Sequence, residues 1–207
     1  MNSTDSSPPA NPADPATVAD PRPREADPGS RLVEHRIAGR QVYRGALLDV
    51  RHDRVRLPDG KEAPREYVVH GGAVLVVPVL DDGRLLVERQ YRYPLARVFL
   101  EFPAGKIDPG EDPQTTGRRE MIEETGYEVA RLSPLGVLHP VISYSTEEIH
   151  CYVGEGLRHV GAQLDHGEFL EVETRSLDEL LAALDRGEIT DSKTVAALLL
   201  YARRVRG

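Results

Sequence analysis

The chain has 207 residues, of which 40% are hydrophobic, and its 34 acidic residues outnumber its 26 lysines and arginines to give a formal net charge of −8. This length fits one substantial domain with at most a small appendage. The longest nearly apolar stretches, Ala73 to Leu80 and Val195 to Tyr201, are far shorter than the ~20 residues of a membrane helix, so we expect no membrane partner. An acidic chain repels nucleic-acid backbones, so we also expect no nucleic-acid partner, and a phosphate-bearing ligand would need a metal ion.

The cellular compartment is indicated by the N-terminus and by cysteine usage. No basic region followed by an apolar stretch is found at the N-terminus, which argues against secretion. The single cysteine, Cys151, can form neither an internal disulfide nor a cysteine-rich zinc site. We therefore expect a cytoplasmic protein in which Cys151 is a small core residue.

Two segments precede the main part of the chain. Residues 1–30 hold seven of the 16 prolines and almost no large apolar side chain, which predicts a disordered tail. In residues 31–70, apolar and polar residues alternate over 41–44 and 47–57, Pro58-Asp59-Gly60 predicts a turn, and a return strand is expected over 65–70. These features predict a small antiparallel sheet, which is marginal alone and needs a surface to pack on.

Residues 71–207 are expected to form the main domain, of class α+β. Its predicted strands are 73–80, 84–91, 98–102, 128–138, 148–153 and 168–174. Pro78 in the first of them indicates an edge strand or a bulge. A loop rich in Gly and Pro follows the third. Mixed strands with separated helices favour a sandwich over a doubly wound sheet.

Three helices are predicted from their ends. Asp112 is a good N-cap, and Pro113 follows at the first helical position, where proline is favoured. Gly126 is a C-terminal stop, so the first helix is expected over 113–125. Ser176 and Glu179 form a capping box for the second. Asp191 or Ser192 begins the third; for Asp191-x-Lys193-Thr194 we favour a capping role over a substrate contact.

Three carboxylates lie on one side of the first predicted helix. Glu120, Glu123 and Glu124 have the spacing i, i+3 and i+4, and the last two lie at the negative end of the helix dipole. Arg119 can neutralise Glu123, which leaves Glu120 and Glu124 as hard oxygen ligands for Mg²⁺ or Mn²⁺. An isolated Arg-Glu-x-x-Glu-Glu, however, more often forms a solvated, salt-bridged face.

The surrounding residues reverse that preference. The chain reads Gly105-x5-Glu111-x7-Arg119-Glu120-Met121-x-Glu123-Glu124-x-Gly126-Tyr127. This pattern matches the Nudix box, and the chain resembles the Nudix hydrolase family at all seven fixed Gly, Arg and Glu positions; Tyr127 departs, because an aliphatic residue is more usual there. The resemblance implies a Nudix α/β/α sandwich with a mixed sheet, preceded here by the small N-terminal antiparallel sheet.

The resemblance also implies a chemistry and a set of roles. Nudix hydrolases cleave a nucleoside diphosphate linked to another group and use divalent cations. By resemblance, Glu120 and Glu124 are metal ligands, Glu123 is a further or shared ligand with a catalytic role, and the carbonyl of Ala104 is another ligand. Arg119 is expected to orient the glutamates, while Glu111 and Gly126 shape the ends of the motif.

A longer resemblance, over about residues 40–205, points to the ADP-ribose pyrophosphatase branch. It includes Gln90-Tyr91-Arg92-Tyr93-Pro94 and residues 101–107. In that branch the N-terminal sheet swaps across a homodimer and holds the adenosine. Arg65 and Glu66 match its Arg-Glu pair, although they fit an ordinary exposed strand equally well. Arg92 matches an arginine that contacts the diphosphate, which suits the two-bond fork of a guanidinium.

A loop after the box is expected to carry one more catalytic carboxylate. The alignment gives this role to Glu147, with Glu148 one position away; either could be a charge at a strand edge. Many ADP-ribose enzymes have proline where this chain has Ile142, which leaves another nucleoside diphosphate sugar, such as GDP-mannose, as a competing substrate.

The sequence therefore predicts a Mg²⁺-dependent homodimer that hydrolyses ADP-ribose to AMP and ribose 5-phosphate. The alternatives within the enzyme class are a pyrophosphatase for another nucleotide sugar and, less favoured, a coenzyme A or oxidised-nucleotide hydrolase. In another class stands a non-catalytic Nudix nucleotide sensor, against which the intact Glu120, Glu123 and Glu124 count.

Overall fold

The computed structural model describes residues 31–162 and 169–207. The predicted tail over residues 1–30 and the first residue of the strand predicted at 168–174 lie outside the described residues. The chain divides into two compact units between Val69 and His70, and each unit is described by itself. No helix among the described residues is long and apolar enough to cross a membrane.

The first unit contains the predicted small antiparallel sheet. Its strands are β1 (His35–Arg44), β2 (Asp49–Arg56) and β3 (Glu62–Val69), paired in the order β1-β2-β3. The turn predicted between β2 and β3 is confirmed: the backbone N–H of Leu57 donates to the carbonyl of Lys61 at 2.8 Å. Gly60 adopts a φ of +85°, a conformation that glycine reaches at little cost.

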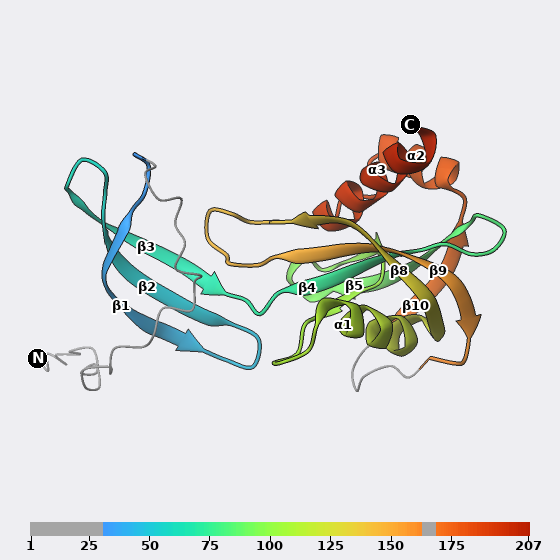
Figure 1. Ribbon diagram of the computed structural model, residues 1–207, viewed down its shortest axis with the longest axis horizontal. Coiled ribbons are helices and arrows are strands. Elements are labelled where there is room, and N and C mark those ends of the chain that lie inside the picture. Colours follow the sequence, from blue (N-terminus) through green and yellow to red (C-terminus); the bar gives the residue numbers. More distant parts are fainter. Residues whose placement is uncertain (1–30, 163–168) are drawn as a thin grey trace, which may run out of the picture. The chain divides into compact units, whose positions relative to one another are not determined.

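The second unit contains two sheets and the helices (Figure 1). One sheet is antiparallel, in the order β10-β5-β6, from β5 (Leu85–Arg92), β6 (Arg97–Glu101) and β10 (Leu170–Arg175). The other has the order β7-β4-β9-β8, from β4 (Ala73–Pro78), β7 (Ala104–Lys106), β8 (Tyr127–Leu138) and β9 (Ile149–His159). The helices are α1 (Pro113–Glu120), α2 (Leu177–Asp185) and α3 (Ser192–Arg206), with single turns η1 (Tyr93–Leu95) and η2 (Met121–Thr125).

The side chains of β4 alternate between two hydrophobic clusters. Leu75 lies in a cluster with Leu180 of α2 and Leu198 of α3. Val74 lies in the other cluster, with Met121. Accordingly α2 and α3 cover one side of the strands and α1 the other, as Figure 1 shows. Because β4 pairs parallel with β9 and antiparallel with β7, the sheet is mixed, and the predicted α/β/α sandwich is confirmed.

One expectation for this sheet was wrong. Pro78 indicated an edge strand or a bulge, yet β4 is an inner strand between β7 and β9. Pro78 is its last residue, opposite Gly154 in an unshifted register. The missing N–H therefore falls where the ladder ends, so an inner strand tolerates the proline.

The first helix has the predicted caps but a different last turn. The carboxylate of Asp112 accepts the N–H of Gln114 at 3.0 Å, and Gly126 ends the helix with a φ of +76°. From Met121 to Thr125 the helix widens into a π turn, in which the hydroxyl of Thr125 donates to the carbonyl of Met121. Such single π turns are frequent at functional sites.

Candidate metal and diphosphate site

Two box carboxylates converge on the short strand β7, which lies in the stretch predicted to be a loop. Oε2 of Glu124 accepts the backbone N–H of Ala104 at 3.0 Å, and Glu124 is only 3% exposed. A Cβ on Gly105 would lie 1.9 Å from Cδ of Glu120, so only glycine lets the Glu120 carboxylate rest against the backbone there. Because Ala104 and Gly105 are adjacent, the structure brings Glu120 and Glu124 to the same place.

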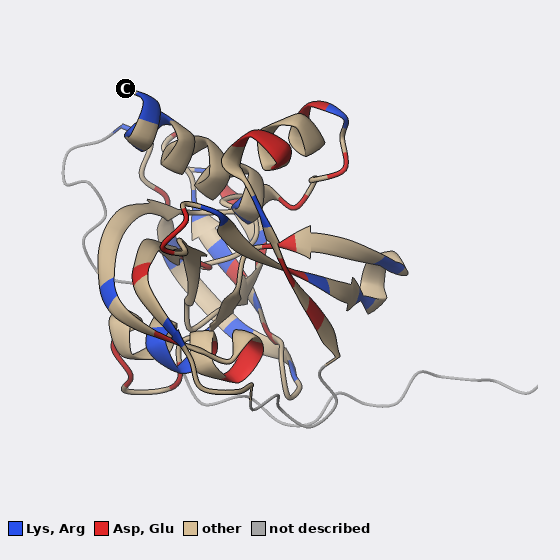
Figure 2. Cartoon of the chain, turned by 90° about the vertical axis from the view of Figure 1, so that its right-hand side faces the viewer, with Lys and Arg blue, Asp and Glu red and all other residues tan. Residues whose placement is uncertain are grey.

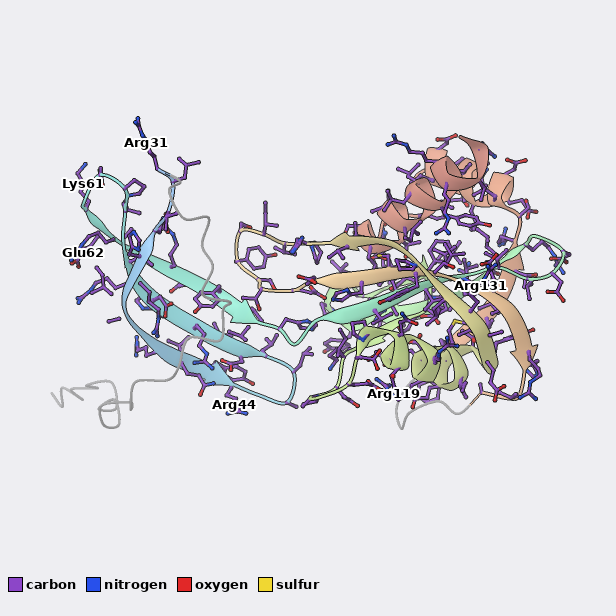
Figure 3. The ribbon with its side chains drawn as sticks, in the orientation of Figure 1. Arg31, Arg44, Lys61, Glu62, Arg119 and Arg131 are labelled. Atoms are coloured by element: carbon purple, nitrogen blue, oxygen red, sulfur yellow. The ribbon has the colours of Figure 1, made fainter. Side chains whose placement is uncertain are left out.

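Arg119, which is labelled in Figure 3, bonds three box carboxylates through one guanidinium. Nη1 donates to Oε1 of Glu120 and to Oε2 of Glu123, both at 2.8 Å. Nε and Nη2 donate to Glu111 at 3.2 and 3.0 Å, and Nη2 also donates to the carbonyl of Lys106 at 3.1 Å. The expected pairing with Glu123 is confirmed. Arg119 also bonds Glu120, which fits its expected role of orienting the glutamates and is possible because a guanidinium has five N–H donors in a fixed fork.

The bonds between Arg119 and its carboxylate neighbours explain how so many charged residues can lie on one helix. Basic and acidic bands lie next to each other there, as Figure 2 shows. The pKa of Arg119 is raised far above its ordinary value, first by the hydrogen bond with Glu111 and then by Glu123 and Glu120, against the opposing effect of burial. The pKa of Glu111 is correspondingly lowered, first by Arg119 and then by the hydroxyl of Thr116. Arg119 thus stabilises the charged forms of its neighbours.

The donors around β7 fit a hard divalent cation. The side chains of Glu120 and Glu124 supply carboxylate oxygens, which Mg²⁺ and Mn²⁺ prefer. In the part of the chain that the structure describes, no group of three or more His, Cys, Asp or Glu side chains is arranged to hold a metal ion as it stands.

Arg92, at the end of β5, forms a two-bond pair with Glu101 of β6. Nε and Nη2 of Arg92 lie 2.7 Å from the two carboxylate oxygens. The Glu101 side chain is 2% exposed and that of Arg92 is 40% exposed. Lys193 of α3 also donates to Glu101. Sequence reasoning missed Glu101; the signal was a charged residue ending an apolar strand just before Phe102.

The start of α3 confirms the predicted cap. Oδ2 of Asp191 accepts the N–H of Thr194 at 3.0 Å and lies 2.9 Å from Nζ of Lys193. The hydroxyl of Thr194 in turn accepts the N–H of Phe102 at 3.1 Å. The N-terminus of α3 is therefore fastened to the residue that follows β6.

Glu147 lies on a tethered loop. The hydroxyl of the preceding residue, Thr146, accepts the backbone N–H of His70 at 2.9 Å. Nδ1 of His70 lies 4.0 Å from the Glu147 carboxylate, too far for a hydrogen bond, and accepts the N–H of Gly72 at 3.1 Å. The Glu147 side chain is 27% exposed and so can reach solvent.

Glu148 has a different environment. One carboxylate oxygen lies 3.0 Å from Nε2 of His150 and the other 3.5 Å from Nε2 of His139. The two candidate carboxylates are therefore distinguished by their partners: Glu148 is held between two imidazoles, while Glu147 is not bonded to the nearby His70 ring.

Arg65 and Glu66 lie on β3 of the first unit, and both are exposed. Nε of Arg65 donates to Glu34 at 2.8 Å, and Nη1 donates to the carbonyl of Pro64 at 2.8 Å. Glu66 is opposite His52 in the β2–β3 register. Because neighbouring strand residues point to opposite faces, these two side chains are directed away from each other.

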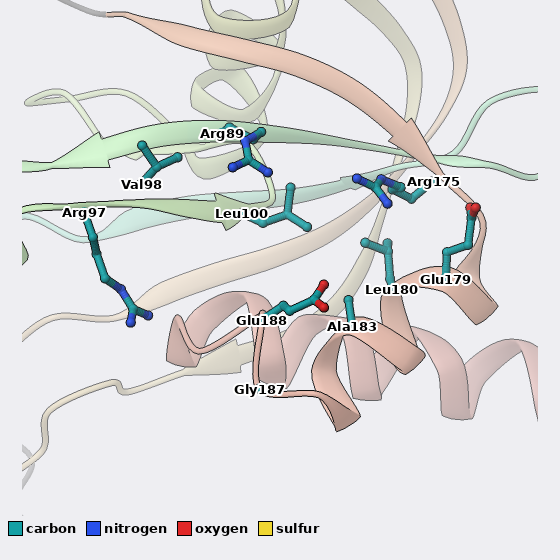
Figure 4. Close-up of a pocket in the computed structure, with 10 residues that line it drawn as sticks. All are labelled: Arg89, Arg97, Val98, Leu100, Arg175, Glu179, Leu180, Ala183, Gly187 and Glu188. Carbon is teal, nitrogen blue, oxygen red and sulfur yellow. The ribbon is translucent and has the colours of Figure 1, made fainter.

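A separate cavity of about 390 Å³ lies beside β5, β6 and α2 (Figure 4). Figure 4 shows Arg89, Arg97 and Arg175 around an apolar floor that includes Leu100 and Leu180. None of the box glutamates lines it. Two of its charged residues have partners: Arg175 donates to Glu173 at 3.1 Å, and Glu188 accepts from Arg186 at 2.6 Å. Sequence reasoning did not predict this cavity.

The fold and the carboxylate cluster define a Nudix protein, and comparison with known families agrees. The NUDIX domain family matches residues 69–198, more than half of the chain, so the chain belongs to the Nudix family. The nucleoside diphosphate sugar hydrolase N-terminal domain matches residues 34–68. Nudix hydrolases generally use divalent metal ions.

Individual relatives cover most of both chains. The chain is 37% identical over 169 residues to an ADP-ribose pyrophosphatase of Bacillus subtilis, covering 81% of this chain and 91% of that protein. It is 38% identical over 172 residues to a methanol dehydrogenase activator of Bacillus methanolicus, covering 82% and 93%. A solved structure described as an ADP compounds hydrolase superposes with a TM-score of 0.77 at 26% identity, covering 84% of this chain and 95% of that chain.

Proposed function

We propose that this Nudix hydrolase cleaves the diphosphate of ADP-ribose to give AMP and ribose 5-phosphate. The observation that carries the proposal is the similarity to an ADP-ribose pyrophosphatase across most of both chains, together with a complete box. In the reaction one P–O bond of the anhydride breaks and water supplies the new oxygen. A small-molecule nucleoside diphosphate sugar is therefore the partner, and a cytoplasmic location is part of the proposal.

The box residues are proposed to hold Mg²⁺ or Mn²⁺. Glu120, Glu124 and the carbonyl of Ala104 are the ligands, and Glu123 is a further or shared ligand. When bound, such a cation neutralises phosphate oxygens and lowers the pKa of a water molecule. Arg119 orients Glu120 and Glu123 through its bonds at 2.8 Å, so these carboxylates are already directed before a cation arrives.

Glu147 is proposed as the carboxylate that positions or deprotonates the attacking water. Its neighbour Glu148 is held by His150 at 3.0 Å, which restricts its reach. The Glu147 carboxylate can move without breaking a hydrogen bond to the nearby His70 ring, because 4.0 Å separates them. A general base must come within hydrogen-bond distance of the proton it removes.

Substrate contacts are proposed from both units. Arg92 contacts the diphosphate with the donors that are not directed at Glu101. Residues 31–70 form a dimerisation unit whose Arg65 and Glu66 contact the adenosine part of the substrate, and residues 71–207 form the hydrolase domain. The homodimer follows from the branch that the chain resembles and from a small sheet that needs a surface to cover it.

A substrate panel tests this function. ADP-ribose, GDP-mannose, UDP-glucose and coenzyme A are incubated with Mg²⁺, and products are separated by ion-exchange chromatography. We expect the highest kcat/KM for ADP-ribose, with AMP and ribose 5-phosphate in equal amounts. A higher kcat/KM for GDP-mannose would replace the proposed substrate, and binding of ADP-ribose without any hydrolysis would support a sensor instead.

A further inference from the structure

A buried chain of charges links α3 to the proposed diphosphate site. Glu101, with its side chain 2% exposed, accepts bonds from Arg92 on one side and from Lys193 on the other. Lys193 is itself only 15% exposed and also lies 2.9 Å from Asp191. Arg92 therefore contacts Glu101, Glu101 contacts Lys193, and Lys193 contacts Asp191.

The geometry of the first pair decides which part of Arg92 faces outward. Its Nε–Nη2 edge is fully directed at Glu101, with both bonds at 2.7 Å. A guanidinium has five N–H donors, so the remaining ones lie on its other edges. Glu101 is buried and occupies the Nε–Nη2 edge, while 40% of the Arg92 side chain is exposed, so a ligand that bonds Arg92 must use the other edges.

The charges explain why a lysine is needed. Arg92, Glu101, Lys193 and Asp191 carry two positive and two negative charges, so removing Lys193 leaves the group with one net negative charge. Glu88 is the register partner of Glu101 and is also buried, and its charge and that of Glu124 act on Arg92 as well. Two cations therefore face four carboxylates, and without Lys193 only Arg92 would face them, so an incoming diphosphate would meet a larger excess of negative charge behind Arg92.

We propose that Lys193 is a positioning residue for diphosphate binding: through Glu101 it fixes the orientation of Arg92 and balances the buried carboxylate, so that the outward edge of Arg92 meets the diphosphate. This inference rests on the proposed function for the role of Arg92. It goes beyond the capping of α3, because Asp191 caps Thr194 through a bond of 3.0 Å that does not involve Lys193.

A double-mutant cycle tests the coupling. Binding of pyrophosphate in the presence of Mg²⁺ is measured by calorimetry for the full-length wild type, Lys193→Met, Arg92→Met and the double variant. Pyrophosphate has two phosphates and no nucleoside, so it reports on the diphosphate site alone. We expect Lys193→Met to weaken binding about tenfold in the wild-type background and less than about twofold once Arg92 is replaced. Equal effects in both backgrounds, or no pyrophosphate binding by the wild type, would overturn the proposal.

Rescue and kinetics separate positioning from a loss of structure. Lys193→Arg keeps a cation that can reach Glu101 and should bind pyrophosphate within about threefold of the wild type. With ADP-ribose, Lys193→Met should raise KM about tenfold and change kcat much less, since the contact forms in the ground state as well as the transition state. Equal falls in kcat and kcat/KM would contradict the inference.

Two further variants serve as checks. Lys61→Met removes an exposed lysine from the β2–β3 turn, where it pairs with Asp59, and should leave pyrophosphate binding unchanged. Lys193→Gln, which removes the same positive charge, replaces Lys193→Met in the cycle if that variant proves unstable in a thermal melt. If the substrate panel shows no hydrolysis of ADP-ribose while the double-mutant cycle shows coupling between Lys193 and Arg92, the proposed substrate is wrong and the role of Lys193 stands.

Discussion

Nη1 of Arg119 lies 2.8 Å from Oε2 of Glu123, four residues further along the same helix. The same nitrogen also bonds Glu120, so a single donor group spans two of the box carboxylates. The helix therefore carries its own counter-ion, and the two carboxylates are oriented before any cation binds.

Replacing Arg119 by lysine tests this orientation. One ammonium cannot reproduce the fork that reaches Glu111, Glu120 and Glu123. For Arg119→Lys we expect activity or apparent Mg²⁺ affinity to fall about 10- to 100-fold, measured by titrating Mg²⁺ in the hydrolysis assay. Arg131→Lys, on β8 in an exposed pair with Glu155 of β9, is the matched control and should resemble the wild type.

The proposed ligands can be tested by removing charge and keeping shape. Glu120→Gln and Glu124→Gln should each lower kcat at least about 100-fold, because a ligand to the cation that stabilises the phosphate charge is lost. The amide oxygen at position 124 can still accept the N–H of Ala104, so the thermal melting temperature should change little. Glu128→Gln, which removes a half-exposed carboxylate on β8, is the control. Full activity of the double glutamine variant would refute the metal site.

Two glycine-to-alanine variants should behave in opposite ways. At Gly105 a Cβ would lie 1.9 Å from Cδ of Glu120, so Gly105→Ala must displace that carboxylate and lower activity strongly. At Gly117 a Cβ would lie 3.1 Å from Val74 and 3.3 Å from Leu132, a tight contact that offsets the gain of about 1 kcal/mol in helix propensity. Gly117→Ala should therefore keep its activity, with a free energy of unfolding within about 1 kcal/mol of the wild type.

Acid should weaken the fold through Glu101. Burial raises the pKa of Glu101, but the hydrogen bonds and charges of Arg92 and Lys193 outweigh it and hold the pKa below the ordinary 4.5. A lowered folded-state pKa stabilises the fold above about 4.5, and this stability is lost as the pH falls through that value toward the folded-state pKa. In urea unfolding, Glu101→Gln should show a smaller decrease in the free energy of unfolding between about pH 7 and about pH 4 than the wild type. An identical decrease would exclude Glu101 as a source of acid sensitivity.

Cys151 should be unreactive in the folded protein. It is 1% exposed within the core cluster, and burial raises the pKa of its thiol to about 11. The thiolate is the reactive form, so little is present at neutral pH. We expect a maleimide reagent to label the chain in denaturant and to leave the native protein unlabelled over hours, as measured by intact mass. Rapid labelling under native conditions would place Cys151 outside the core.

The features that the sequence predicts correctly are those set by residues close to one another in the chain. Asp112 and Gly126 cap the box helix through residues within one or two turns, and the capping box at Ser176 likewise acts over three residues. The side of β4 that each residue faces follows from strand alternation. These elements were predicted because their determinants lie beside them in the chain.

The missed features depend on residues that are distant in sequence. Glu101 and Lys193 are 92 positions apart, and nothing in either local sequence indicates that they meet. Similarly, the widened turn from Met121 ends at Gly126, where a Cβ would lie 2.6 Å from the backbone of Ala162. Pro78 was misjudged because its tolerance depends on where the neighbouring strands end.

The bond between Glu124 and the main chain of Ala104 bears on how such enzymes can diverge. A backbone donor persists through every side-chain replacement except proline, so the residue at position 104 can be exchanged without releasing the carboxylate. The side chain at position 104 can therefore vary while the Glu124 carboxylate stays held in the same place.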